Sequence, residues 1–229
     1  MSVLAIETAT SVCAAAVVQD GRVLAESSVN RRFVHAERLM GLIDEVMQKS
    51  AIKLSGLDAV AVSIGPGSFT GLRIGLSAGK GIAYGLSKPI VSVPTLEALA
   101  SRIAGTVPDG DFILSALDAR RDEVYCQLFK VQQGNLAPVW QERAMSINGM
   151  LTAVDNRRVN ISGDAREKIK AAMTGVHPGV DVVFAKDDLS LCSAGSVGLL
   201  GEQLLLRGCI AEASTLEPRY IKEFFTVTA

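Results

Sequence analysis

Two short runs of polar residues, one in each half of the chain, have the composition of a phosphate or metal site. Residues 7–10 (ETAT) and residues 118–121 (DARR) each follow an apolar stretch that is typical of a buried strand. A carboxylate can position Mg²⁺ or water, while hydroxyls and backbone amides contact phosphate oxygens. Alternatively, these polar groups only satisfy the backbone at a strand end. The candidate nucleotide-contacting residues are Glu7, Thr8, Thr10 and Asp118.

A glycine-rich run at residues 65–71 (GPGSFTG) precedes a predicted helix. Its glycine spacing is not the dinucleotide fingerprint, and residues 75–81 are not a Walker A loop. We therefore interpret the run as a tight turn before a helix that Ser68 or Thr70 caps. Gly71, Gly75 and Gly79 recur every four residues and therefore share one helix face. Such a face allows close approach of another backbone. The sequence leaves open whether that backbone belongs to a partner or to this protein's own sheet.

Metal and disulfide chemistry have little support in the sequence. The two histidines, His35 and His177, are far apart, and the four cysteines form no C-x-x-C pair. We therefore predict no metal site and a reduced, cytoplasmic setting. The net charge of −1 does not favour direct nucleic-acid binding, and no segment has the length and apolarity of a membrane span.

Hydrophobic periodicity predicts three short strands within residues 3–29, a helix over 35–50, a strand over 57–64, and a helix over 70–86. A further strand (90–93) and helix (95–104) complete the first half. One apolar stripe on the first helix, which represents on the order of 10 kcal/mol of burial, is formed by Leu39, Leu42, Ile43, Val46 and Met47. The core, a partner, or both must cover that stripe.

The second half of the chain repeats the plan of the first. A shift of 111 positions places residues 4–7 (LAIE) on residues 115–118 (SALD), so a carboxylate follows the first strand in both halves. The sequence thus predicts a duplicated α/β fold resembling the actin, hexokinase and heat-shock ATPase superfamily, with ribonuclease H-like lobes that each hold a mixed sheet and helices. We place the N-terminal lobe at 1–105 and the C-terminal lobe at 106–229, and this division allows helix 193–208 to pack back on the first lobe.

Four segments together resemble the TsaB (YeaZ) family. They are residues 4–10 (LAIETAT), 65–75 (GPGSFTGLRIG), 118–125 (DARRDEVY) and 216–222 (LEPRYIK). The resemblance implies a relationship to TsaD, the subunit that transfers a threonylcarbamoyl group to the adenosine beside the tRNA anticodon. TsaD carries a metal-binding H-x-x-x-H motif at a helix start. Thr95 and Leu99 stand at the matching positions here and cannot replace imidazole. Glu7 departs from the family's usual Asp.

The same resemblance implies a non-catalytic scaffold that binds TsaD and with it TsaE, forms a possible homodimer, and meets tRNA only through the complex. No cofactor is required, although ATP or ADP at a partner interface is possible. The first two helices form the interface in this family. The interface residues expected here are His35, Leu39, Leu42, Ile43, Val46, Gly71, Arg73, Gly75 and Gly79. The alternative is an ATP-using enzyme of the sugar-kinase type.

Overall fold

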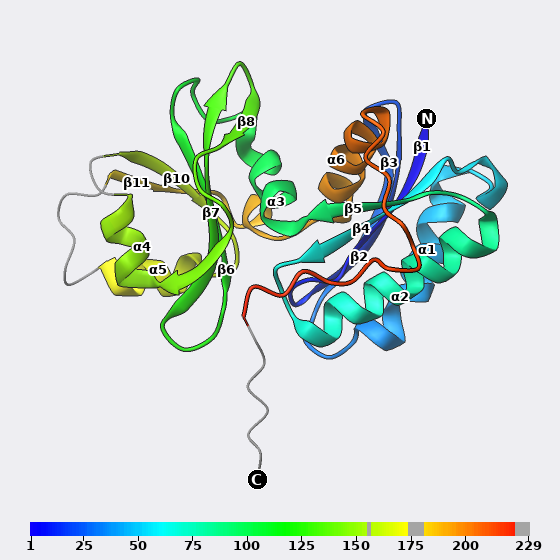
Figure 1. Cartoon of the computed structure of the whole chain (residues 1–229), viewed down its shortest axis with the longest axis horizontal. Helices are drawn as coiled ribbons and strands as arrows, with labels where there is room; N and C mark the ends of the chain where they lie inside the picture. Colours follow the sequence, from blue (N-terminus) through cyan, green and yellow to red (C-terminus); the bar gives the residue numbers. More distant parts are fainter. Residues whose placement is uncertain (155–156, 174–180, 223–229) are drawn as a thin grey trace, which may run out of the picture.

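The computed structural model describes residues 1–154, 157–173 and 181–222 of the 229-residue chain. His177 lies outside the described residues. Two lobes lie side by side, and the last described residues run back between them (Figure 1). Each lobe is built on a mixed sheet flanked by helices.

The N-terminal sheet has the strand order β3-β2-β1-β4-β5. Its strands are β1 (Ser2–Glu7), β2 (Val12–Gln19), β3 (Arg22–Asn30), β4 (Ala59–Gly65) and β5 (Ile90–Pro94). β1 pairs antiparallel with β2 and parallel with β4. Asp20 and Gly21 form the β2–β3 turn with φ values of 50° and 73°, the left-handed conformation that a tight hairpin requires. Helices α1 (His35–Ser50) and α2 (Phe69–Leu86) pack on this sheet.

The C-terminal sheet repeats this order as β8-β7-β6-β10-β11, with β9 also paired to β7. Its strands are β6 (Phe112–Asp118), β7 (Glu123–Gln132), β8 (Asn135–Pro138), β9 (Arg143–Ser146), β10 (Arg158–Ser162) and β11 (Asp181–Phe184). Helices α4 (Ile147–Ala153) and α5 (Arg166–Met173) complete this lobe, and short 3₁₀ turns, η1 (Leu54–Gly56) and η2 (Asp188–Ser190), lie in connections. Both lobes share one topology, which confirms the predicted duplication.

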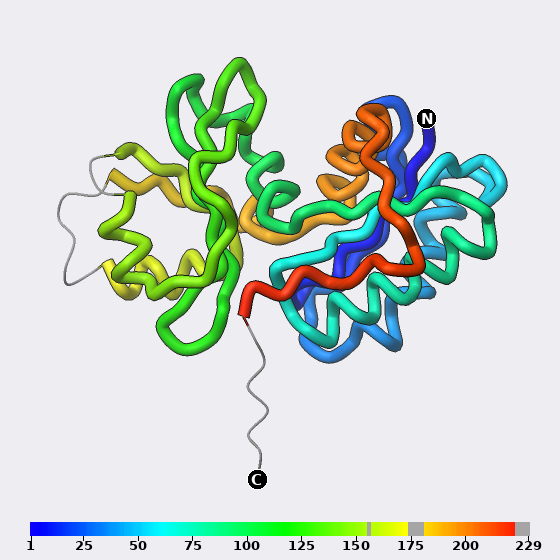
Figure 2. Tube along the Cα trace, in the orientation of Figure 1, coloured from blue at the N-terminus to red at the C-terminus, as the bar shows by residue number. Residues whose placement is uncertain are grey.

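Each half of the chain supplies a helix to the other half. α6 (Ala194–Leu206) lies on the N-terminal sheet, where Val197 and Leu200 pack with Val3 and Val91. Gly201 permits this approach, because a Cβ there would lie 2.5 Å from Ala61 Cβ. α3 (Thr95–Ala104) in turn packs its last turn on the C-terminal sheet, and Figure 2 shows its path between the two lobes.

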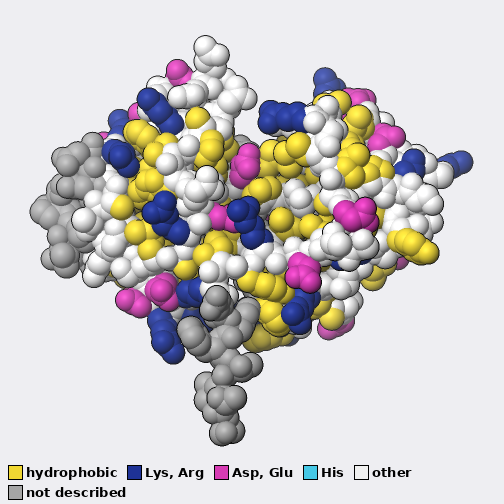
Figure 3. All heavy atoms as spheres, viewed as in Figure 1, with side chains coloured by type: hydrophobic (Ala, Val, Ile, Leu, Met, Phe, Trp, Pro, Cys, Tyr) yellow, Lys and Arg dark blue, Asp and Glu magenta, His cyan; other side chains and the backbone are white. Residues whose placement is uncertain are grey.

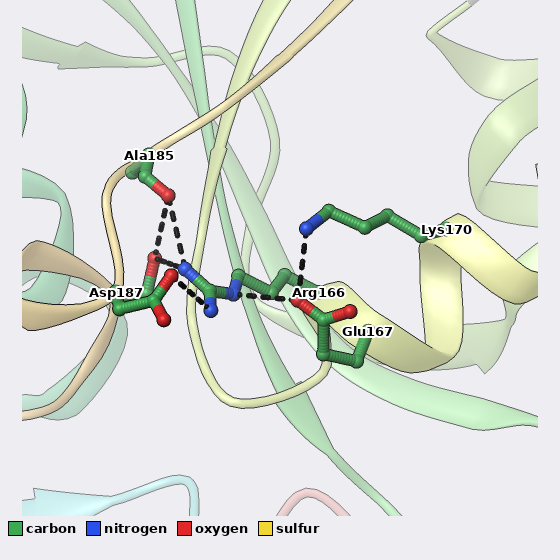
Figure 4. Close-up of polar contacts among 6 residues, drawn as sticks. Arg166, Glu167, Lys170, Ala185 and Asp187 are labelled. Atoms are coloured by element: carbon green, nitrogen blue, oxygen red, sulfur yellow. Dashed lines mark hydrogen bonds and ion pairs between the residues drawn. The ribbon is translucent and has the colours of Figure 1, made fainter.

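A cluster of charged residues fixes the connection that leads back to the N-terminal lobe (Figure 4). Arg166, largely buried at the start of α5, donates to Ala185 O (3.1 Å) and pairs with Asp187 (2.5 Å) and Glu167 (3.1 Å). Lys170 Nζ extends the cluster through Glu167 at 2.8 Å. The guanidinium therefore ties α5 to the segment that precedes α6.

The apolar stripe of α1 is buried within the protein itself. The described chain buries all five expected interface residues of this helix in its own core, namely His35, Leu39, Leu42, Ile43 and Val46. His35 Nε2 donates to Val12 O at 3.2 Å, which fixes the helix start against β2. The prediction that these residues face a partner is therefore wrong, because the N-terminal sheet covers them. Within the described ranges, no helix is long and apolar enough to cross a membrane.

Candidate functional site

Glu7 ends β1 and is almost completely buried, with 1% of its surface exposed. Its Oε1 accepts a hydrogen bond from Ala9 N at 2.6 Å, so the carboxyl folds back on its own loop. Burial raises the pKa of Glu7 to about 7, although backbone hydrogen bonds from Ala9 and Thr8 and one from Ser63 oppose the shift. A carboxyl in this state is poorly suited to hold a solvated metal ion.

The two threonines of the first loop have different surroundings. Thr8 is fully buried, and its Oγ1 has no hydrogen-bond partner among the described residues. Thr10 is half-buried, and its Oγ1 accepts from Val12 N at 3.2 Å. Of the first-loop candidates, Thr10 is therefore the side chain with solvent access.

Asp118 ends β6, at the position equivalent to Glu7, but its side chain is partly exposed. Its Oδ1 accepts from Arg120 N and from Lys168 Nζ, each at 2.8 Å. Partial burial acts to raise the pKa of Asp118, but the hydrogen bonds from Lys168 and Arg120 outweigh it and lower that pKa. The carboxylate is thus charged and already neutralised by an ammonium group of the chain.

A second lysine reaches the same loop from the C-terminal end of the described chain. Lys222 Nζ donates to Ala119 O at 2.9 Å and to Glu123 Oε2 at 2.6 Å. Sequence reasoning missed both Lys168 and Lys222, because they are far from the loop along the chain and belong to no local motif. Together they occupy acceptors that a cation or a ligand donor would otherwise use.

The glycine-rich loop at 65–71 is shaped by close backbone contacts. Ser68 caps α2, as predicted, by accepting from Gly71 N at 3.3 Å. Ser68 N donates to Ala9 O at 2.7 Å, and a Cβ on Gly67 would clash with that same carbonyl. The glycine-rich loop therefore packs closely against the backbone of residues 8–9.

The three glycines of α2 face inward, which corrects the interface prediction for them. A Cβ on Gly71 would clash with Thr8 O, and one on Gly75 would clash with Thr8 Oγ1. A Cβ on Gly79 would clash with Val62 of β4. The close-approach face thus packs against this protein's own β1–β2 loop and sheet. Arg73, in contrast, is exposed on the opposite side of α2.

Thr95 and Leu99, which the resemblance leads us to expect at the positions of the TsaD histidines, have structural roles here. Thr95 is fully buried, and its Oγ1 accepts from Gly65 N at 3.1 Å, while Leu99 packs with Leu117 and Cys192. Across the described part of the chain, no group of three or more His, Cys, Asp or Glu residues could hold a metal ion.

The outward side of α1 and α2, which we call the outer face, carries exposed apolar side chains among charged and polar ones. Phe33 just before α1 is 98% exposed, with a φ of 65°, and Met40 and Tyr84 are also exposed. A shallow hollow between the helices lies on this face. The hollow is lined by Ala36, Phe69, Thr70, Arg73, Ile74 and Ser77. Gly81 and Gly85 on the exposed side of α2 leave open space, since a Cβ on either would meet nothing within 4 Å.

Two lobes with one strand order, each with an acidic residue ending its first strand, define a duplicated α/β protein of the actin-like, ribonuclease H-like class. A family model described as TsaD, tRNA N6-adenosine threonylcarbamoyltransferase, matches residues 24–199. The chain therefore belongs to this family, and within it to the TsaB (YeaZ) group.

Three relatives support that placement. The tRNA threonylcarbamoyladenosine biosynthesis protein TsaB of Escherichia coli K12 is 38% identical over 125 residues, covering 55% of this chain and 53% of that protein. The Bacillus subtilis protein of the same name is 34% identical over 139 residues, covering 61% and 59%. The solved structure of YeaZ from Pseudomonas aeruginosa has a TM-score of 0.80 at 26% identity, covering 96% and 99%. The chain thus spans a little over half the length of the two curated relatives.

Proposed function

We propose that this chain is a non-catalytic subunit supporting threonylcarbamoyl transfer to the tRNA adenosine next to the anticodon. Its relatives from E. coli and B. subtilis are named as proteins of this biosynthesis, and the matching family model describes the transferase TsaD. In this proposal the chain acts in the cytoplasm, binds TsaD and with it TsaE, and meets tRNA only through the complex. It requires no cofactor of its own, and ATP or ADP would bind at a partner interface.

The observation that carries this proposal is the outer face of α1 and α2. Met40 and Tyr84 are exposed, and the hollow that Ile74 lines lies on the same two helices, so this side offers apolar surface that water covers in the free chain. Gly81 and Gly85 leave room for a second helix to approach closely. In this proposal α1 and α2 pack on two helices of TsaD, which buries the apolar surface. A homodimer would form when a second copy of the chain binds the same face.

The absence of catalysis is proposed on separate grounds. Thr95 and Leu99 occupy the positions that carry the metal-binding histidines in TsaD, and both are buried in packing. A hydroxyl and an alkyl group there cannot supply imidazole ligands.

The outer face is tested by a paired charge substitution. Met40→Asp with Tyr84→Asp places two carboxylates on the surface that a partner would dehydrate, so we expect loss of TsaD capture and of reconstituted tRNA modification. The control is Val139→Asp with Val183→Asp, which changes two exposed apolar residues of the C-terminal lobe. Light scattering of the free chain reports whether the same change removes a homodimer.

Two results would contradict the proposal. One is a reconstituted reaction that runs at full rate without this chain. The other is unchanged TsaD affinity for the Met40 and Tyr84 double variant.

An ATP-using enzyme of the sugar-kinase type is the second candidate. The equivalent positions of Glu7 and Asp118, at the ends of β1 and β6, favour it. ATP hydrolysis by the purified chain, lost in both Glu7→Ala and Asp118→Ala, would support this candidate over the scaffold.

A further inference from the structure

Residues 209–222, which we call the C-terminal strap, leave α6 and run back across the molecule to end between the lobes (Figure 1, red). The strap begins beside β5, where Ala211 N donates to Ile90 O at 2.9 Å. Leu216 then packs against the core formed by α1, α2 and the sheet. The strap contains no helix, and apart from the single bridge between Ala211 and Ile90 it pairs with no strand, so specific contacts must hold it.

The strap docks on the glycine-rich loop of the N-terminal lobe. Arg219 N donates to Ile64 O at 2.7 Å, and a Cβ on Gly65 would lie 2.5 Å from Arg219 O. The first glycine of the GPGSFTG run therefore leaves room for the strap. Tyr220 continues this contact, since its hydroxyl accepts from Arg73 Nε at 3.0 Å and its ring lies 5.0 Å from that of Phe69.

The same few residues also hold the C-terminal lobe. Arg219 Nε pairs with Glu142, whose side chain is only 6% exposed, and Lys222 Nζ reaches Glu123 Oε2 at 2.6 Å. Lys222 also donates to Ala119 O in the loop that follows β6. Arg219 thus contacts one lobe through its backbone and the other through its guanidinium.

We infer that the C-terminal strap is a reversible latch, which clamps the two lobes together and covers two acceptors after β6, Ala119 O and Glu123. Its contacts with the C-terminal lobe depend on two cations, Arg219 and Lys222, both of which keep some solvent exposure. The Lys222–Glu123 pair is partly exposed on both sides, so it is weak and screened by salt, whereas Glu142 in the Arg219 pair is almost fully buried. The latch therefore opens without unfolding either lobe, and its opening frees Ala119 O and Glu123 for a ligand or a partner segment.

The surface of the protein shows that the gap between the lobes is open at one end and closed further down, as a latch between the lobes requires. Figure 3 shows a notch between the lobes at the top of the view, and side chains close the gap below it, in the middle of the view. The lobes are joined elsewhere by the connections around α3 and α6, which act as the hinge in this inference.

Distance measurement between spin labels tests the latch directly. One label is placed at Gln48→Cys on α1 and the other at Asn135→Cys on β8, both exposed positions. Cys209→Ser removes the exposed native thiol, while Cys13, Cys126 and Cys192 are buried. The latch variant is Arg219→Gln with Lys222→Gln. Its control, Arg22→Gln with Lys53→Gln, removes the same charge from exposed sites on the N-terminal lobe.

We expect one narrow distance distribution for the parent protein at low salt, which broadens and shifts as salt rises. The latch variant should show the broad distribution at every salt concentration, while the control follows the parent. Thermal unfolding of each variant checks that both lobes stay folded. A folded latch variant with the parent's distribution at all salt concentrations would overturn the inference. Because no partner protein is present, that outcome would leave the proposed scaffold function untouched.

Discussion

Glu7 shows how burial changes the behaviour of a residue whose position is evident from the sequence. Its place after the first strand follows from the apolar run before it and from the 111-residue repeat. Its near-complete burial cannot be predicted from the sequence, because the residues that bury it are distant along the chain. Burial raises its pKa from the ordinary 4.5 to about 7. The carboxyl therefore stabilises the fold most when it is protonated.

The pH dependence of stability follows from that shift. Between the unfolded pKa of 4.5 and the folded pKa of about 7, the unfolded chain binds fewer protons at Glu7 than the folded chain. The contribution of Glu7 is thus fully present below pH 4.5 and is lost as pH rises through about 7. The shift corresponds to about 3 kcal/mol. Glu7→Gln, which keeps an acceptor for Ala9 N, should remove this dependence.

Urea unfolding of the parent and of Glu7→Gln at several pH values between 5 and 8 checks the prediction. The variant should gain stability relative to the parent as pH rises, by up to about 3 kcal/mol at pH 8. A difference that stays constant over this range would show that Glu7 does not titrate as its burial implies.

At the scale of the element, α2 shows what periodicity can and cannot predict. The helix, its Ser68 cap and the shared face of Gly71, Gly75 and Gly79 were all predicted. The direction of that face was not, since spacing states which residues lie together but not what lies opposite. Thr8, which fills the space beside Gly75, comes from a loop more than sixty residues earlier.

Two glycines of α2 make a matched pair for testing this orientation. Gly75→Ala forces a Cβ against Thr8 Oγ1, so it should lower the free energy of unfolding by about 1–3 kcal/mol. Gly81→Ala adds a Cβ in open space within the same helix, so it should raise that free energy by about 0.5–1 kcal/mol. Chemical denaturation measures both. Equal effects at the two positions would mean that α2 does not pack as described.

At the scale of the whole molecule, the two halves of the sequence do not coincide with the two packed lobes, because α6 and the strap come from the second half and pack on the N-terminal lobe. The shared plan of the two lobes follows from the repeat, and the prediction allowed helix 193–208 to return to the first lobe. The strap, and Lys222 that it brings to the loop after β6, had no comparable signal, because residues 209–222 have no hydrophobic period. Such contacts depend on tertiary structure and are specified by no local pattern.

The return of α6 makes residues 1–105 an incomplete folding unit. Val197 and Leu200 cover the face of the N-terminal sheet that carries Val3 and Val91, so a fragment of 1–105 would expose that face to water. We expect this fragment to show no cooperative thermal transition by circular dichroism. Joining 1–105 to 191–222 through a Gly/Ser linker should restore one, because α6 then reaches the sheet again. Val197→Asp in the joined chain should abolish the transition, since the carboxylate would be buried without a partner. Cooperative melting of 1–105 alone would show that α6 is dispensable for this lobe.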